Sequence, residues 1–509
     1  MSAKASYFII FIMQKGERTV KLNFENYRDK VQACWLGKNI GGTMGTPYEG
    51  KREILDINGF TSKPGEPLPN DDLDLQLVWL YAMERMGEQS LNASVLADYW
   101  THLIPPCWNE YGIGKANVRR GLMPPLSGDY NNDWKHSNGA WIRTEIWACL
   151  CPGRPSQAVK YAVEDAMVDH GSGEGTVAAA FVAAMQSAAF VVDNIHDAIK
   201  IGLAAIPENS RVAKSIALLY ECKEKGLTAI EARNAIQQAN ADIGDGWFEA
   251  PSNVAYAVLG MLYGEGDFKK SMILAINCGD DTDCTGATVG STLGILNGMK
   301  VIPEDWKEYI GDRIITVSIA MGICNSRIPK TCTELTERVA ALAPKVLNVK
   351  SSYSVELVEG EESIPENIFD VIMKDVDLKH PLESLIPNSM RFDTPFFFIT
   401  VVYDGKPEIS PLEEKTVILK FENKHSTRSN FGLSNPHNLT LRWLGCEKLR
   451  AESKTAVTLM HKTAHSQAVL ELHVKVTAGE SIDPINRIVL EIVNEGKAQI
   501  HYVPITFLG

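Results

Sequence analysis

The stretch GDDTDCTGATVGSTLGILNG, residues 279–298, joins an acidic turn to a regular glycine pattern. Glycine recurs at every fourth position, at Gly286, Gly290, Gly294 and Gly298, and the pattern predicts a helix with one glycine face. Each glycine inside a helix costs about 0.8–1 kcal/mol relative to alanine, and close approach to a second helix is the usual compensation. We therefore expect this helix to cross the core at short range and to hold the preceding aspartates against it.

Two acidic clusters, about two hundred residues apart, are the best candidates for the chemistry of this chain. Asn70-Asp71-Asp72 precedes an apolar helical run, and Asp281 and Asp283 precede the glycine helix. Residues two apart do not share a helix face, so we expect Asp281 and Asp283 to line a loop. If the fold brings the clusters together, two carboxylates about 4 Å apart repel by roughly 4 kcal/mol at an effective dielectric near 20. No Lys or Arg lies within five residues of either aspartate of the second cluster. A hard cation such as Mg²⁺ would resolve the conflict, because it binds carboxylate, amide and hydroxyl oxygens.

Each cluster also has a simpler interpretation. Asp71 and Asp72 suit the first turn of a capped helix, which contributes about 1 kcal/mol. The string 281–285 begins like an EF-hand loop, but the twelfth position is Thr292 where a bidentate Glu is required. The same string fits the DxDx(T/V) nucleophile motif of haloacid-dehalogenase-type phosphatases, with residues 272–276 as the preceding strand. The phosphatase alternative stays open at this point.

Further motifs accompany the two clusters in a fixed order. They are GKNIGGTMGTPYE (37–49), NDD (70–72), NGA (138–140) with Arg143, DHG (169–171) and GDDTDCTGATVG (279–290). Over about residues 25–345 this series resembles the ADP-ribosylglycohydrolase family, which includes the bacterial dinitrogenase reductase-activating glycohydrolases and the eukaryotic ADP-ribosyl hydrolases. The resemblance implies an all-helical domain and a metal-dependent glycohydrolase. Such an enzyme cleaves the glycosidic bond at the anomeric ribose carbon of ADP-ribosylated protein or small-molecule substrates.

The resemblance also implies roles for individual residues. It places two Mg²⁺ ions, with Mn²⁺ as a substitute, among Glu49, Asn70, Asp71, Asp72, Asp281 and Asp283. It makes Glu49, Asp72 and Asp281 the catalytic candidates, and Asn138, Gly139, Arg143, His170 and Gly171 the substrate-binding candidates. Two positions depart from the family pattern, since Asn70 and Cys284 each replace a common threonine. A thiol is a soft and poor ligand for Mg²⁺, whereas Asn70 still offers an oxygen.

These departures leave two other functions open. One is hydrolysis of another ribofuranoside, such as a nucleoside or a glycan fragment. The other is a non-catalytic ADP-ribose-binding module.

Composition narrows the class of protein. The chain has 509 residues, 45% of them hydrophobic, which is ample for two domains. A formal net charge of −13 without a Lys/Arg-rich run argues against nucleic acid as a partner. The ten cysteines lack CxxC spacing, so we expect reduced thiols, no zinc site and a cytoplasmic location. The apolar run 7–13 is too short to cross a membrane, so no membrane partner is expected.

Sequence texture divides the chain. Apolar residues recur at three- and four-residue steps from about residue 26 to 343, whereas residues such as 416–422 and 470–476 alternate. We expect an all-α ADP-ribosylglycohydrolase-like helical domain followed by a smaller all-β sandwich domain. The predicted boundaries are 1–21 for a leader, 22–346 for the catalytic domain, 347–391 for a connector with a short helix near 368–376, and 392–509 for the β-sandwich. The β domain shows no catalytic cluster, so packing or oligomerisation is its expected role.

Aromatic and basic residues supply further candidates for substrate contact. Five tryptophans fall within one loop-rich stretch, where one or two rings are candidates to stack on a base or sugar, while Trp141 and Trp147 are expected in the core. Arg119, Arg120 and Arg143 are the cations placed best for a pyrophosphate.

Overall fold

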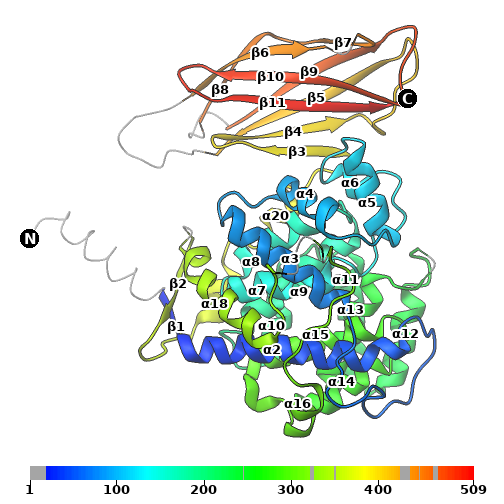
Figure 1. The fold of residues 1–509 in the computed structure, drawn as a ribbon, viewed down its shortest axis with the longest axis vertical. Helices are drawn as coiled ribbons and strands as arrows, with labels where there is room; N and C mark the ends of the chain where they lie inside the picture. The colour runs from blue at the N-terminus through cyan, green and yellow to red at the C-terminus, as the bar shows by residue number, and fades with distance from the viewer. Residues whose placement is uncertain are drawn as a thin grey trace, which may run out of the picture.

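The computed structural model describes residues 19–509, apart from 245, 321, 323–325, 349–350, 425–435, 446 and 462–467. A large helical domain carries a smaller β domain at one end (Figure 1). The apolar run 7–13 and most of the predicted leader therefore lie outside the described residues.

Helices dominate the described chain from residue 24 to residue 347, which confirms the all-α expectation for this part. They are α2 (Phe24–Gly45), η1 (Thr46–Tyr48), α3 (Asp71–Met86), α4 (Ala93–Leu103), α5 (Asn109–Arg119), α6 (Leu126–Asp129), η2 (Trp141–Arg143), α7 (Glu145–Leu150), α8 (Pro155–Ala166), α9 (Glu174–Ala188), α10 (Ile195–Ala204), α11 (Arg211–Glu224), α12 (Ala229–Ala239), α13 (Ala250–Gly264), α14 (Phe268–Ile276), α15 (Thr282–Asn297), η3 (Met299–Val301), α16 (Glu304–Ile310) and α18 (Cys332–Leu347).

The close helix packing predicted from the glycine stripe is confirmed. A Cβ added to Gly37 of α2 would overlap the backbone of Gly290 in α15, and one added to Gly41 would overlap Gly286. Glycines therefore face each other along both helices, and the two backbones approach as closely as the absence of side chains permits. This contact fixes the N-terminal end of α15 against the C-terminal end of α2.

Two local expectations were wrong. The segment 272–276 is not a strand, because it lies in helix α14. Asp283 does not line a loop, because α15 begins at Thr282 and places Asp283 in its first turn, while Asp281 occupies the N-cap position. Asp281 and Asp283 still face one site because the chain turns into the helix between them.

A small parallel sheet joins the two ends of the helical domain. Strand β1 (Thr19–Asn23) pairs with β2 (Ser354–Val358) in register from Thr19 with Ser354 to Asn23 with Val358. The side chain of Asn23 also caps α2, since its oxygen accepts a hydrogen bond from the Asn26 amide. The first strand thus leads directly into the central helix.

The β domain is a sandwich of antiparallel sheets, as expected. One sheet has the order β11-β10-β6-β8 and the other β3-β4-β5-β9-β7. Buried residues of both sheets form one shared apolar core. The strands are β3 (Ser389–Asp393), β4 (Phe397–Tyr403), β5 (Glu414–Asn423), β6 (His437–Leu444), β7 (Leu449–Glu452), β8 (Ala456–Leu459), β9 (Val469–Ala478), β10 (Ile485–Asn494) and β11 (Ile500–Leu508).

Short helices and direct contacts connect the two domains. The connector carries α19 (Ile368–Met373), which ends before the predicted position 376, and α20 (His380–Glu383). Residues around α6 reach into the β domain: Leu126 packs in the core of the sandwich, and Tyr130 donates a 2.7 Å hydrogen bond to Glu408. The exact division at residues 21, 346 and 391 stays a prediction.

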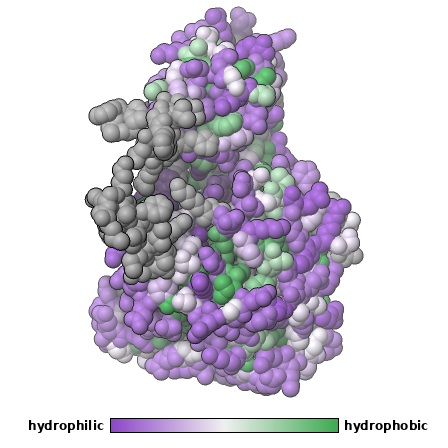
Figure 2. Space-filling model, turned by 90° about the vertical axis from the view of Figure 1, so that its left-hand side faces the viewer, coloured by the Kyte–Doolittle hydropathy of each residue, from purple (hydrophilic) through white to green (hydrophobic). Residues whose placement is uncertain are grey.

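The face shown in Figure 2 is largely hydrophilic, with some apolar side chains gathered on the helical domain below the junction of the two domains. Within the described ranges no helix combines the length and apolar character needed to cross a bilayer. The eight cysteines in those ranges are free thiols.

Candidate metal centre

The N-termini of two helices meet at the end of α2. Asn70 caps α3, and its side-chain oxygen accepts a 2.7 Å hydrogen bond from the Asp72 amide. Asp281 stands at the start of α15, and the Thr282 hydroxyl donates a 2.9 Å hydrogen bond to the Gly45 carbonyl of α2. The capping expected for the first cluster is therefore present, and it orients the aspartates that follow toward the second cluster.

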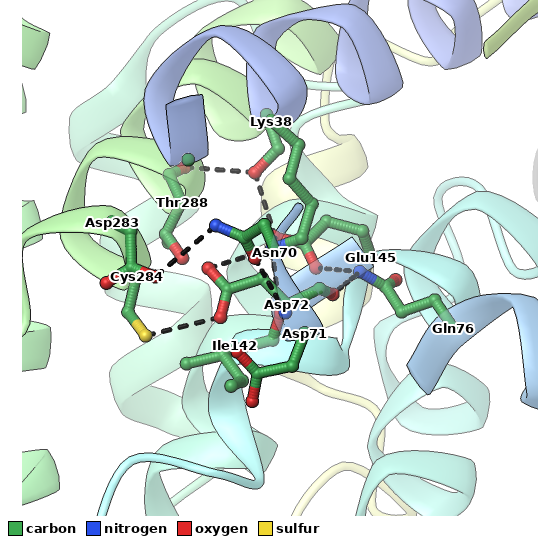
Figure 3. Close-up of polar contacts among 12 residues, drawn as sticks. Lys38, Asn70, Asp71, Asp72, Gln76, Ile142, Glu145, Asp283, Cys284 and Thr288 are labelled. Carbon is green, nitrogen blue, oxygen red and sulfur yellow. Dashed lines mark hydrogen bonds and ion pairs between the residues drawn. The ribbon is translucent and has the colours of Figure 1, made fainter. Parts of the chain in front are cut away.

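Direct contacts join the two acidic clusters across more than two hundred residues of sequence (Figure 3). The amide of Asn70 lies 3.4 Å from Asp283 Oδ2. The Cys284 thiol donates to Asp72 Oδ1 at 3.2 Å. Ligand atoms of Asp281, Asp283 and Cys284 all lie within 4.8 Å of one another. The geometry thus gathers several cation ligands at one point.

The carboxylates at this point are buried and incompletely satisfied. Asp72 is fully buried, and Asp281 and Asp283 are each 4% exposed. One oxygen of each, namely Asp72 Oδ2, Asp281 Oδ1 and Asp283 Oδ1, finds no hydrogen-bond donor among the described residues. Because buried polar atoms are normally paired, the unpaired oxygens of Asp281 and Asp283, beside an Asp72 Oδ2 that lies 3.9 Å from the Lys38 ammonium group, fit a cation better than they fit a purely structural cluster.

Burial and mutual repulsion raise the pKa values of the acidic groups, in the direction expected for a site that needs a cation. Burial raises the pKa of Asp72 and Asp281 well above the usual range, and neighbouring carboxylates add to both shifts. Burial likewise raises the pKa of Asp283 to about 6. The charge of Asp283 is the main cause that raises the pKa of Glu49 to about 8. A bound divalent ion would reverse these shifts by stabilising the ionised forms.

The other two members of the first motifs lie nearer to solvent. Glu49 follows η1 and is exposed at the edge of the cavity, facing Asp283. Asp71 is half-buried, and its Oδ2 accepts a 2.9 Å hydrogen bond from the Tyr111 hydroxyl. Asp280, although adjacent to Asp281, points elsewhere, since its carboxylate accepts hydrogen bonds from the Phe248 amide and the Asn253 side chain.

The buried cation Lys38, which the sequence analysis missed, points toward the acidic cluster from α2 (Figure 3). Lys38 of α2 donates a 3.1 Å hydrogen bond to Glu145 and lies 3.9 Å from Asp72 Oδ2. Burial alone would lower the pKa of Lys38, but Glu145 and Asp72 raise it, so the ammonium group is retained. Gln76 donates a 3.0 Å hydrogen bond to the other Glu145 oxygen. The hint of this buried charge in the sequence was that Lys38 lies within a glycine-rich helix.

A cavity of about 470 Å³ opens onto the acidic cluster. Glu49, Asn70, Asp71, Asp281 and Asp283 line it together with Cys284, and we call it the acidic cavity. No Lys or Arg occurs among the described residues that line it. Its further lining residues are Thr46, Pro69, Trp108, Asn109, Glu110, Tyr111, Ser137, Asn138, Gly139, Ile142, Phe248 and Val317.

Two of the predicted substrate-binding residues line this cavity. The Asn138 amide donates a 2.6 Å hydrogen bond to Asp281 Oδ2, and its oxygen accepts from the Trp141 indole at 3.0 Å. Gly139 has no space for a side chain, because an added Cβ would overlap Glu110.

The other three do not line the cavity. Arg143 is fully buried and forms hydrogen bonds with Asp169, at 2.8 and 3.0 Å, and with the Gly139 carbonyl. His170 is also fully buried, 2.9 Å from Asp169 and 3.2 Å from the Ser137 hydroxyl. Gly171 adopts a left-handed φ of 52° beside them. These residues hold the 137–139 segment in place rather than reaching into the acidic cavity.

Aromatic residues form part of the cavity rim. Trp108 is 49% exposed and lines the acidic cavity, whereas Trp100, Trp141 and Trp147 are fully buried. Arg119 and Arg120, proposed from sequence for a pyrophosphate, end α5 at the surface and are absent from the cavity lining. Tyr111, Glu110 and Phe248 are lining residues that the sequence analysis missed. The sequence offered one hint that Glu110 and Tyr111 line the cavity, namely that they lie close to Trp108 in the chain.

Comparison with known proteins identifies the family of this chain. The family model described as ADP-ribosylglycohydrolase matches residues 23–343. The chain belongs to the ADP-ribosylglycohydrolase family, and this membership makes it a hydrolase of the glycosidase class. The phosphatase alternative is wrong. The chain belongs to another family, and residues 272–276, which the phosphatase motif requires as a strand, lie in a helix.

Structural comparisons give weaker likenesses. A structure described as an ADP-ribosylglycohydrolase-related protein complex has 20% identity and a TM-score of 0.43, covering 63% of this chain and 99% of that chain. A FixG-related protein from Vibrio parahaemolyticus has 16% identity and a TM-score of 0.17, covering 23% of this chain and 97% of that chain. No curated protein matches the chain.

Proposed function

We propose that this protein is a metal-dependent glycohydrolase that cleaves the bond at the anomeric carbon of a ribose in ADP-ribosylated protein or a small ADP-ribosyl compound. The observation that carries the proposal is the meeting of Asp72, Asp281 and Asp283, each buried and each with one oxygen that finds no donor among the described residues. Asn70, Asp71 and Glu49 complete a set of oxygen ligands suited to two Mg²⁺ or Mn²⁺ ions.

When bound, such ions would bind sugar hydroxyls and water and stabilise charge as the glycosidic bond breaks. Glu49 faces the acidic cavity at its exposed edge, where a carboxylate can exchange protons with water and with a leaving group. Asn138 fixes the orientation of Asp281 through its 2.6 Å hydrogen bond. Trp108 offers an exposed ring at the rim on which a base can stack.

The two departures from the family pattern reduce the number of free oxygens that the site offers to a metal. Asn70 keeps one oxygen, but that oxygen is already engaged with the Asp72 amide. Cys284 donates to Asp72, so the thiol hydrogen occupies one oxygen of a proposed ligand. We expect tighter binding of Mn²⁺ than of Mg²⁺, because Mn²⁺ tolerates softer surroundings.

The test is a calorimetric titration of ADP-ribose into metal-stripped protein at rising Mn²⁺ or Mg²⁺ concentration, with turnover of ADP-ribosylated peptides measured in parallel. Affinity and turnover should both require the metal, and Asp281→Asn should lose both. Asp280→Asn is the matched control, because the Asp280 carboxylate lies outside the cavity lining. Equal affinity with and without metal, together with intact binding by Asp281→Asn, would refute the proposal.

A second substrate class is favoured by one observation. The described lining of the acidic cavity carries no Lys or Arg to pair with a pyrophosphate. A neutral ribofuranoside, such as a nucleoside or a glycan fragment, avoids the repulsion that a diphosphate meets beside Glu49 and Glu110. Competition between ADP-ribose and ribose for the metal-loaded protein separates the two classes, because only the first predicts markedly tighter binding of ADP-ribose.

A further inference from the structure

A second cavity, of about 240 Å³, lies between the helical domain and the β domain. Its walls come from three parts of the chain: helix α8 with the residue before it, the connector near α20, and strands β3 and β4, which lie on the side of the sandwich that faces the helices (Figure 1). We call it the interdomain pocket. None of the proposed metal ligands lines it.

Arg154 is the unusual residue of this pocket. Its side chain is buried, with 2% of the residue exposed, and its Nε has no hydrogen-bond acceptor among the described residues. The ring of Tyr353, 5.8 Å from the guanidinium carbon, is its charge-stabilising contact. A buried guanidinium normally pairs with a carboxylate, as Arg143 does with Asp169 in this same domain. Arg154 instead lines a cavity.

Permanent cations outnumber carboxylates in the lining of the interdomain pocket when Arg154 itself is counted. Lys160 is exposed at the same pocket, and Arg391 of β3 lines the opposite wall beside Phe398. Glu164 lies 3.9 Å from Arg391, and Asp377 is the other carboxylate of the lining. Three permanent cations against two carboxylates leave a net charge of +1, in a chain whose formal net charge is −13.

The start of α8 adds one candidate backbone donor to the pocket, because the Gln157 and Ala158 amides already donate to the Arg154 carbonyl. Arg154 occupies the N-cap position and Pro155 follows at the first helical position, so Ser156 supplies the first free amide of the helix. Ser156 lines the pocket and α8 is twelve residues long. A helix N-terminus carries partial positive charge and exposed N–H groups, which favour an anion.

We propose that the interdomain pocket binds a phosphate group, held by Arg154, Lys160 and Arg391 and by the N-terminus of α8. A guanidinium can donate two parallel hydrogen bonds to phosphate oxygens, which would satisfy the Arg154 nitrogen that lacks an acceptor among the described residues. The pocket volume exceeds that of a phosphate ion, so both inorganic phosphate and the phosphate of a small ester fit this chemistry. Because both domains contribute cations, the bound anion would also strengthen their contact.

The experiment is a calorimetric titration of inorganic phosphate into the full chain, with ribose 5-phosphate in a second arm. Wild type should bind one phosphate per chain. Arg154→Gln should bind at least about tenfold more weakly, since it loses charged hydrogen bonds. Lys160→Gln should bind about threefold more weakly, since its exposed charge is partly screened. Tighter binding of the ester identifies a phosphorylated metabolite as the ligand, and equal binding identifies free phosphate.

Controls separate this site from the rest of the molecule. Arg450→Gln removes an exposed charge in β7, outside the pocket, and should bind phosphate as wild type does. Asp281→Asn should also keep phosphate binding, so the result is independent of the proposed glycohydrolase function. If Arg154→Gln does not fold, Lys160→Gln decides, because Lys160 is exposed. Absence of saturable binding by wild type up to about 10 mM, or equal affinity in wild type and Lys160→Gln, would overturn the proposal.

Discussion

The acidic cavity and the interdomain pocket differ in the sign of their charge. Both contain buried charged side chains with an atom that lacks a hydrogen-bond partner among the described residues. In the first, three buried carboxylates each keep an oxygen without a donor among the described residues; in the second, a buried guanidinium keeps a nitrogen without an acceptor there. The overall charge of −13 gives no sign of the interdomain pocket, whose lining carries three permanent cations and two carboxylates. Unpaired buried atoms therefore indicate the charge of a ligand more directly than composition does.

The largest effect is expected for Asp281→Asn, which tests whether the acidic cavity is built for a cation. Activity should fall at least about 100-fold, because a ligand of the proposed metals is lost. Metal-free protein should at the same time become more stable by on the order of 1 kcal/mol, since one member of a set of repelling buried carboxylates is neutralised. Turnover assays and urea denaturation in EDTA measure the two changes.

Opposite signs of these two changes are the informative result. A purely structural aspartate would lose stability on substitution, as Asp280→Asn should, because its carboxylate accepts hydrogen bonds from Phe248 and Asn253. Loss of stability by metal-free Asp281→Asn would contradict the cation interpretation.

The Lys38→Met variant removes the buried ammonium group that contacts Glu145 and Asp72 next to the acidic cavity. The expected loss of stability is about 3 kcal/mol, because Glu145 and Asp72 are left buried without their positive partner. Chemical denaturation measures the loss. In the double variant Lys38→Met/Glu145→Gln the loss should be smaller than in Lys38→Met alone. Equal losses in both variants would mean that packing, rather than charge, explains the effect.

Gly37→Ala tests how rigid the wall of the acidic cavity is. A Cβ at this position would overlap the Gly290 backbone, so α2 and α15 must separate, at a cost of about 1–3 kcal/mol. Because the separation moves the start of α15, metal affinity should fall together with the melting temperature. Gly59→Ala is the control, since an added Cβ there meets nothing within 4 Å. Unchanged metal affinity in a destabilised Gly37→Ala would separate the helix contact from the site.

The smallest effect is expected for Cys284→Thr, which restores a hydroxyl beside Asp72. Mg²⁺ affinity should rise several-fold and the preference for Mn²⁺ should shrink, because an oxygen ligand replaces a soft sulfur. Calorimetric titration with both metals checks this. A lower Mg²⁺ affinity in the variant would show that the thiol is not the cause of weak binding.

Sequence reasoning reached the features whose signal is local. The glycine spacing of residues 286–298 predicted the close helix contact, and the alternation in residues such as 470–476 predicted strands. The paired acidic motifs identified the aspartates that the fold brings together.

The sequence did not predict the features that depend on residues far apart in the chain. Lys38 and Glu145 are 107 residues apart in the chain, so no local pattern predicts their ion pair. Arg143 was expected at a substrate, and only the position of Asp169 shows that it supports the 137–139 segment instead. The interdomain pocket was beyond prediction because three separate segments form it.

The pairing of β1 with β2 has a consequence for biosynthesis. Strand β1 can pair with β2 only after Ser354, which lies opposite Thr19 and follows it by 335 residues, has been synthesised. At typical elongation rates of about 5–20 residues per second, the wait is on the order of 20 to 70 s on the ribosome. During this interval the unpaired edge of Thr19–Asn23 is open to any other extended segment, so this strand is a place where a nascent-chain chaperone would prevent wrong pairing.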